Sequence, residues 1–80
     1  MNVEHLIQMA NQIGAYFETE PDRAVARAGI ADHLARFWEK RMRQTLYEYL
    51  DKEKESEIDP LVNEALIQYR GDILGISRQV

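Results

Sequence analysis

Apolar residues recur at intervals of three and four in the first part of the chain, and this spacing limits what the chain can fold into. One face of a helix over this segment would carry Val3, Leu6, Ile7, Ala10, Ile13, Gly14 and Phe17. Polar residues occupy the positions between them, which is the pattern of an amphipathic helix. Pro21 disfavours helical dihedral angles at the residue before it, so we expect this helix to end near Glu18 or Thr19.

A second helix is predicted to open around the first proline. Thr19 can cap its N-terminus, Pro21 is tolerated in a first turn, and Asp22 is favourable at the positive end of the helix dipole. The buried face of this helix would carry Ala26, Ile30, Leu34 and Phe37. Glycine costs about 1 kcal/mol relative to alanine in a helix interior, so Gly29 predicts a close approach of another helix.

A third periodic set continues from the second with no glycine or proline to divide them, and it comprises Met42, Leu46, Tyr49 and Leu50. The pattern leaves open whether residues 22–52 form one helix or two. A single helix of about 30 residues would be about 45 Å long and would leave much apolar surface uncovered. We therefore favour a bend near residues 38–40.

Residues 51–57 are nearly all charged, which is typical of a frayed helix end and a solvated linker. Asp59 as cap and Pro60 as first residue then predict a fourth helix. Its buried face would carry Leu61, Val62, Ala65, Leu66 and Tyr69. Gly71 is the predicted stop of this helix.

The helical pattern as a whole predicts an all-α fold, a small bundle of three to four helices. We expect a single helical domain over residues 1–71 and a C-terminal tail over residues 72–80. A chain of 80 residues with 45% hydrophobic content buries only a thin core, and such domains commonly depend on disulfides, a metal or a partner. Cysteine is absent, which excludes disulfides and thiolate-bound clusters, so association with a partner is the expected support.

Composition and charge narrow the class of partner. The chain has no apolar run long enough to span a membrane, and its first residues lack the features of a signal peptide, so we expect a cytoplasmic protein. A net charge of −4 argues against unselective binding to nucleic acid, which depends on neutralising phosphates. A rival hypothesis, disfavoured by the acidic flanks, is a nucleic-acid-binding regulator that uses Arg36, Lys40, Arg41 and Arg43.

The sequence contains few candidates for catalytic residues. His5 falls on the polar side of the first helix, and we interpret His33, at the edge of an apolar stripe, as a packed structural histidine. No carboxylate lies in an apolar run that would suit it to general-acid chemistry. The serines, Ser56 and Ser77, fall in the linker and the tail. We therefore predict no catalytic residue, no metal ligand and no cofactor held by this chain.

Residues 30–43 gather the single tryptophan and four cationic side chains. Tryptophan and arginine dominate the energetics of protein interfaces, so one hypothesis is that Trp38 and Arg41 insert into a partner. In a continuous helix, one face would carry Arg36, Lys40 and Arg43. The alternative, given equal weight, is that Trp38 belongs to the core and the cations form a solvated face.

Five short segments occur in an order and spacing that resemble a known family. They are Met9-Ala-Asn-Gln-Ile-Gly14, Gly29-Ile-Ala-Asp-His-Leu34, Phe37-Trp38, Arg41-Met-Arg43 and Asp59-Pro-Leu-Val62. Together they resemble the delta subunit of NAD-dependent formate dehydrogenase over about residues 3–67. The chain departs from that family at Lys40, where the family usually has proline.

The resemblance implies a non-catalytic accessory subunit of a cytoplasmic complex that oxidises formate to carbon dioxide and reduces NAD. The implied partners are the catalytic and electron-transfer subunits, which would hold a molybdenum or tungsten bis-pterin cofactor, iron–sulfur clusters and a flavin. The alternative is a transient assembly or cofactor-maturation chaperone for the same enzyme. Isolated copies of the chain are expected to form a homodimer where the partner is missing.

Seven residues are predicted to contact the partner, because they match the family pattern and helix amphipathicity does not explain all of them. These residues are Asn11, Gln12, Asp32, His33, Trp38, Arg41 and Arg43. The sequence leaves open which subunit they contact.

Overall fold

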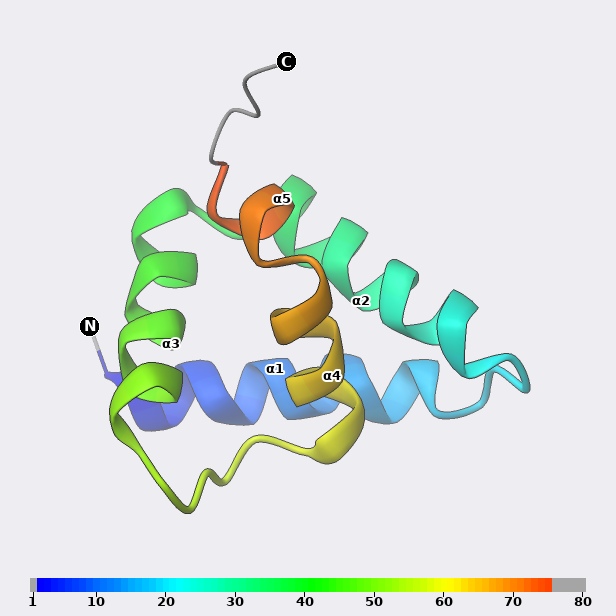
Figure 1. Cartoon of the computed structure of the whole chain (residues 1–80), viewed down its shortest axis with the longest axis horizontal. Helices are drawn as coiled ribbons and strands as arrows, with labels where there is room; N and C mark the ends of the chain where they lie inside the picture. The colour runs from blue at the N-terminus through cyan, green and yellow to red at the C-terminus, as the bar shows by residue number, and fades with distance from the viewer. Residues whose placement is uncertain (1, 76–80) are drawn as a thin grey trace.

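The computed structural model describes residues 2–75, which fold into five helices (Figure 1). They are α1 (Val3–Phe17), α2 (Arg23–Phe37), α3 (Lys40–Lys52), α4 (Pro60–Gln68) and α5 (Arg70–Leu74). No strand occurs within residues 2–75, so the predicted all-α class is confirmed. The predicted number of three to four helices is too low, because the pattern does not reveal α5. None of the helices in this part of the chain has the length and apolar character needed to cross a membrane.

Helices α1 and α2 form a V that closes at the turn between them and opens toward α3 (Figure 1). Helix α4 packs against α1 and α2, and α5 packs against α2 and α3, so both fill the space in front of the V. The core lies where these helices meet. Its large, fully buried side chains are Ile30, Leu34, Leu46, Leu61, Val62, Leu66 and Ile73.

Side-chain caps set the starts of the first two helices. Asn2 Oδ1 accepts hydrogen bonds from backbone N–H groups in the first turn of α1, and Asp22 caps α2 in the same way. The predicted Thr19 cap is wrong, because Thr19 Oγ1 donates to a carbonyl oxygen in the last turn of α1 at 2.8 Å. Pro21 therefore precedes the cap of α2. The predicted end of α1 near Glu18 is confirmed.

The chain breaks sharply between α2 and α3 with no proline at the junction. Trp38 and Glu39 both adopt extended backbone angles, with ψ values of 138° and 149°. The Trp38 N–H group closes α2 on the Leu34 carbonyl oxygen, and the Trp38 side chain is only 5% exposed. Burial of this large side chain stabilises the turn. The predicted bend near residues 38–40 is confirmed, and residues 22–52 form two helices.

Phe37 corrects one part of the predicted core. Its side chain is 71% exposed, whereas Ala26, Ile30 and Leu34 of the same predicted face are buried. The cause is the break after α2, because Trp38 leaves the helical path and takes the interior position at this end of the helix. Phe37 consequently points to the surface.

The C-terminal part is more ordered than the sequence pattern predicts. Helix α4 starts at the predicted Asp59–Pro60 step. The predicted stop at Gly71 is wrong, since α4 already ends at Gln68 and Gly71 lies within α5. Helix α5 ends at Leu74, and its C-cap is Gly75, whose φ of 74° suits glycine. Ile73, in α5, is fully buried. The rest of the predicted tail, residues 76–80, lies outside the described residues.

Close packing around α1 explains why glycine occupies two positions in the helices. A Cβ atom on Gly29 would collide with the ring of Phe17, so the close approach predicted at this position is confirmed. A Cβ atom on Gly14 would likewise collide with Val62 of α4. Helix α1 therefore lies close to both α2 and α4 without room for larger side chains at these points.

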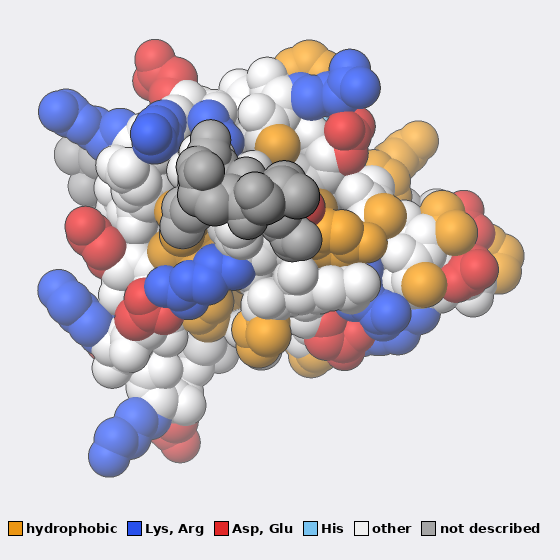
Figure 2. Space-filling model, turned by 45° about the horizontal axis from the view of Figure 1, so that its top comes forward, with side chains coloured by type: hydrophobic (Ala, Val, Ile, Leu, Met, Phe, Trp, Pro, Cys, Tyr) orange, Lys and Arg blue, Asp and Glu red, His pale blue; other side chains and the backbone are white. Residues whose placement is uncertain are grey.

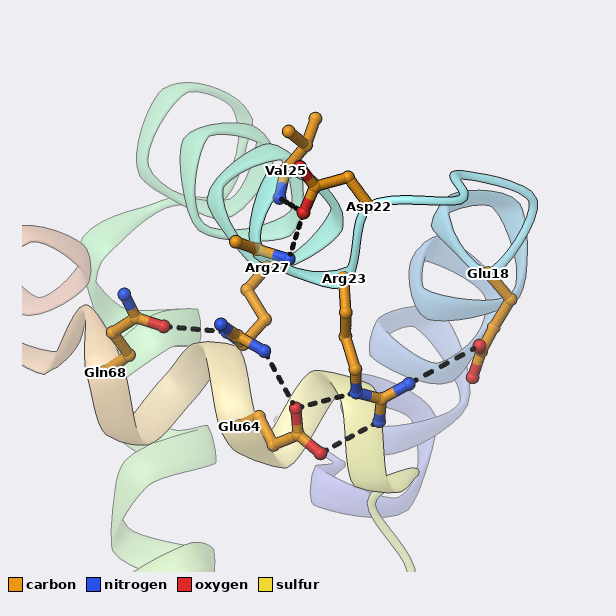
Figure 3. A network of polar contacts seen from close by, with 8 residues as sticks. Glu18, Asp22, Arg23, Val25, Arg27, Glu64 and Gln68 are labelled. Atoms are coloured by element: carbon orange, nitrogen blue, oxygen red, sulfur yellow. Dashed lines mark hydrogen bonds and ion pairs between the residues drawn. The ribbon is translucent and has the colours of Figure 1, made fainter.

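A polar network on the surface joins α2 to α4 (Figure 3). The guanidinium group of Arg23 pairs with the Glu64 carboxylate at 2.8 Å, and Arg27 contacts the same carboxylate and the side chain of Gln68. Hydrogen bonding from Arg23 holds the pKa of Glu64 below its ordinary value. Because the ion pairs of this network remain accessible to solvent, with Arg23 exposed and Arg27 and Glu64 only partly buried, the network fixes how α4 lies on α2 more than it adds stability.

Candidate partner-binding groove

A groove with a volume of about 410 Å³ lies between α1 and α2. One wall is a face of α1, and the other comes from α2 and the residue that follows it. The lining residues are Met9, Gln12, Ile13, Tyr16, Phe17, His33 and Trp38. The α1 members are spaced by three and four positions, so a single helix face forms that wall. We call this surface the α1–α2 groove.

The lining has the composition of an interface core. Among the described residues, no Asp, Glu, Lys or Arg side chain lines the α1–α2 groove. Tyr16 is 71% exposed and meets Phe17 edge to face, with ring centroids 5.0 Å apart. Interface cores are depleted of charged residues and enriched in aromatic residues and methionine. This surface is therefore suited to apolar side chains of another polypeptide.

Phe37 extends the aromatic surface beyond the groove itself. Its ring lies against the ring of His33, with centroids 4.9 Å apart, and His33 lines the groove. His33 is half-buried in this arrangement, whereas Phe37 is exposed. Aromatic side chains left in water at the edge of an apolar groove mark a surface for association.

Three of the seven predicted contact residues come together in the α1–α2 groove, namely Gln12, His33 and Trp38. Gln12 is exposed and His33 is half-buried, so both side chains reach the surface. Trp38 lies in the core, as one of the two alternatives predicted, and only its small remaining exposed part faces the groove. Trp38 therefore supports the groove from within, and its contact with a partner stays a prediction.

Two predicted contact residues bind other parts of the same chain. Asn11 Nδ2 donates to the Glu57 carbonyl oxygen at 3.0 Å, and its Oδ1 accepts from the Asp59 N–H group at 2.9 Å. Arg43 donates to the Ile73 carbonyl oxygen and so joins α3 to α5. These hydrogen bonds give both residues a structural reason for their presence, independent of any partner.

The remaining two predicted residues lie on the surface. Asp32 pairs with Arg36 within α2 at 2.9 Å, and Arg41 is exposed in the first turn of α3. The cationic face expected for a continuous helix does not form, because the break places Arg36 on α2 and Arg43 on α3. The four cations therefore do not form one continuous helical stripe.

Sequence reasoning missed most of the groove, whose unpredicted residues are Met9, Ile13, Tyr16, Phe17 and the neighbouring Phe37. Ile13, Phe17 and Phe37 were assigned to buried helix faces, and Met9 and Tyr16 were assigned no contact, because amphipathicity does not separate a core face from a groove wall. One signal was available: residues 6–17 contain no Asp, Glu, Lys or Arg, although such residues make up 30% of the chain. A helix whose outer face is also uncharged has more than one face to cover.

The groove is suited to binding more than to catalysis. Within residues 2–75, no three His, Asp or Glu side chains lie close enough together to hold a metal ion. Gln12, Tyr16 and His33, three of the lining residues, carry polar side-chain groups that can orient a bound segment by hydrogen bonding.

The fold and the groove define a small helical module with a surface suited to binding another protein. A family model described as the NADH-dependent formate dehydrogenase delta subunit, FdsD, matches residues 5–66, and the chain belongs to this family. The match spans most of α1, all of α2 and α3, and most of α4, and so includes every residue of the groove lining. No curated protein and no solved structure matches the chain.

Proposed function

We propose that this chain is a non-catalytic accessory subunit that binds the catalytic subunit of a cytoplasmic formate dehydrogenase and stabilises the assembled enzyme. Its membership of the delta-subunit family supports a place in that complex. Formate oxidation and electron transfer would be carried by the cofactor-bearing subunits. The contribution of this chain would be contact through the α1–α2 groove.

The observation that carries the proposal is the uncharged aromatic surface of the groove. Tyr16 and Phe37 are each 71% exposed, in a chain whose other aromatic side chains are more buried. Covering one such side chain contributes about 1.5–3 kcal/mol, so two anchors contribute a substantial part of a stable interface. A partner that covers this surface would gain that free energy.

The test compares two exposed apolar positions on different faces. Phe37→Ser removes an anchor beside the groove, and Ile67→Ser on α4 is the control, because Ile67 is 64% exposed and lies outside the groove. Tagged variants are co-expressed with the other subunits, and the recovered catalytic subunit and formate-dependent NAD reduction are measured. We expect Phe37→Ser to lower recovery about tenfold or more, which is about 1.4 kcal/mol, and Ile67→Ser to leave it unchanged.

Both side chains are exposed, so both variants should keep the helical circular dichroism spectrum and melting temperature of the parent protein. Equal recovery with Phe37→Ser and with the parent chain would contradict the proposal. The stoichiometry of the purified enzyme then separates the two roles within the proposal. A fixed ratio to the active catalytic subunit indicates a permanent subunit, whereas recovery with only inactive, cofactor-free subunit indicates a maturation chaperone.

A further inference from the structure

His33 is the residue of the α1–α2 groove whose charge depends on pH near neutrality. Histidine side chains gain a proton as the pH falls from about 8 to about 5. Among the described residues, the groove lining contains no Asp, Glu, Lys or Arg, and its other titratable residue is a tyrosine, a type that ionises only in alkaline solution. Near neutral pH, the charge of the lining is therefore set by one imidazole.

A partner seated on the groove would cover His33 as well. His33 is half-buried, and its ring lies against the exposed ring of Phe37, with centroids 4.9 Å apart and ring planes at 47°. Covering Phe37 and the groove therefore removes water from the imidazole. Loss of water penalises the protonated form much more than the neutral form, unless an opposite charge lies close by.

Neither α2 nor α1 supplies such an opposite charge. Asp32 precedes His33 on α2, but its carboxylate accepts a hydrogen bond from Arg36 at 2.9 Å, and Asp32 lines a separate hollow between α2 and α5. This ion pair leaves little net charge beside the imidazole. On α1, which forms the other wall, Glu4 and His5 line a different hollow at the start of the helix.

The other helices that pack against α2 direct their charges elsewhere. These helices are α4 and α5. Glu64 of α4 belongs to the network with two arginines of α2 (Figure 3). On α5, Arg70 pairs with Asp51 of α3 at 2.7 Å, and Asp72 lies with Tyr69 in the hollow between α2 and α5. Within residues 2–75, these helices therefore provide no counter-charge in the groove.

The surface outside the groove is charged, with acidic and basic side chains interspersed on the face that Figure 2 shows. Glu39, which follows Trp38, is exposed and does not belong to the groove lining. Exposed charges are screened by water and salt, so they do little to support a charge that is covered inside an interface. Among the described residues, a protonated His33 would therefore have no close counter-charge once the groove is covered.

Resting on the function proposed above, we infer that protonation of His33 weakens docking of the catalytic subunit on the α1–α2 groove. The groove binds the subunit with a neutral imidazole, and binding releases the proton from chains whose His33 carries one. By linkage, the full affinity is present where the free imidazole is neutral and is lost as the pH falls. Acidification thus favours release of this chain from the enzyme.

The test uses the two histidines of the chain. His33→Gln keeps a polar side chain that cannot be protonated, and His5→Gln is the matched control, because His5 is exposed and lies outside the groove. Full-length protein is bound to immobilised enzyme purified without this chain, and the Kd is measured between about pH 8 and about pH 5.5. Circular dichroism at each pH verifies that the chain stays folded.

From about pH 7.5 to about pH 5.5, we expect the Kd of the parent chain to rise about five- to tenfold more than the Kd of His33→Gln. His5→Gln should follow the parent chain within about twofold. Equal pH dependence of the parent chain and His33→Gln would overturn the inference. Tighter binding of the parent chain at low pH would also overturn it, since the partner would then place a carboxylate against His33.

A second measurement does not depend on a variant at His33. Titration calorimetry at about pH 6, in two buffers with different heats of ionisation, gives the number of protons released when the parent chain binds. We expect a net release of protons. Binding with no release, or with proton uptake, would contradict the inference even if His33→Gln bound too weakly to compare.

The Phe37→Ser variant in the same assay separates this inference from the proposed function. Loss of binding with Phe37→Ser, together with equal pH dependence of the parent chain and His33→Gln, leaves the proposed function standing and overturns the role of His33. Unchanged binding of Phe37→Ser contradicts the proposed function, and the inference falls with it.

Discussion

At the scale of single residues, Asn11 has the clearest structural role among the predicted contact residues. Its side-chain amide bonds to backbone groups on either side of residue 58, which anchors the charged linker to α1. Tyr49 supports the same linker, since its hydroxyl oxygen accepts from the Glu57 N–H group at 2.9 Å. A segment whose composition is typical of solvated chain is thereby held in one place.

Asn11→Ala is expected to lower the free energy of unfolding by about 1–3 kcal/mol, because it removes hydrogen bonds to two backbone groups, of which the Asp59 N–H group is partly buried. Gln12→Ala is the matched control, since Gln12 is the exposed neighbour on the same helix. Urea denaturation of both variants measures the difference. Equal stability of the two variants would show that Asn11 is retained for a reason other than the linker.

Tyr47 is a buried residue that sequence periodicity did not select. Its hydroxyl donates to the Leu66 carbonyl oxygen at 2.6 Å, and its ring lies 4.9 Å from the guanidinium carbon of Arg70. Burial raises the pKa of the Tyr47 hydroxyl above its ordinary value, although the nearby Arg70 acts in the opposite direction. The folded protein therefore keeps this proton at a pH where the unfolded chain loses it.

A raised pKa in the folded state means that stability is complete below the ordinary tyrosine pKa of about 10 and falls as the pH rises above it. Tyr47→Phe should therefore cost about 1 kcal/mol at neutral pH, through the lost hydrogen bond. It should also lessen the fall in stability above about pH 10. Thermal unfolding of both proteins between neutral and alkaline pH tests this, and parallel pH profiles would contradict it.

At the scale of helices, the sequence predicted positions well wherever local chemistry decides them. Helical spacing and the Asp59–Pro60 step identified four of the helices, because periodicity and caps act within a few residues. Thr19 was mistaken for a cap because Asp22, three residues later, has an equally suitable side chain. Helix α5 has only five residues and escapes any method that depends on repeated spacing.

The break between α2 and α3 lies where the delta-subunit family usually has proline in place of Lys40. The effect of that proline on stability can be tested in this chain. Lys40 is the first residue of α3, and Glu39 before it has the extended angles, φ −64° and ψ 149°, that proline requires of its predecessor. Lys40→Pro should therefore raise the free energy of unfolding by about 0.4–1 kcal/mol, by restricting the unfolded chain. Chemical denaturation provides the measurement.

Gln44→Pro is the control in the same helix, because position 44 lies inside α3. Proline there removes an intrahelical hydrogen bond and should destabilise the protein by about 3 kcal/mol or more. Destabilisation by Lys40→Pro of similar size would mean that the first turn of α3 cannot accept the geometry that proline imposes.

At the scale of the whole molecule, packing between helices was beyond prediction from this sequence. Buried faces were correctly assigned for much of α2 and α4, but a stripe of apolar residues does not identify the helix it packs against. The network of Arg23 and Glu64 joins residues 41 positions apart, and the groove exists only because α1 and α2 diverge from their turn. These features depend on tertiary arrangement, which local spacing does not encode.

The close contact of α1 with α4 can be tested by substituting alanine for Gly14, with the same substitution at Gly71 as the control. Gly14→Ala places a methyl group against Val62 in the buried interior, and the resulting overpacking should outweigh the better helix propensity, for a net loss of about 1–2 kcal/mol. Gly71→Ala meets no atom within 4 Å in α5 and should stabilise the protein by about 0.5–1 kcal/mol. Melting temperatures that move in opposite directions would confirm the difference, and a gain with Gly14→Ala would contradict it.

Trp38 belongs both to the core and to the lining of the groove, which connects assembly with the lifetime of the chain in the cell. A partner that binds only the folded state adds about 2.7 kcal/mol of stability at a hundredfold excess over its Kd. An orphan copy lacks that increment, unfolds more often and is exposed to proteases for longer. We therefore expect surplus copies to be degraded, so that proteolysis keeps the amount of this subunit matched to the amount of its partner.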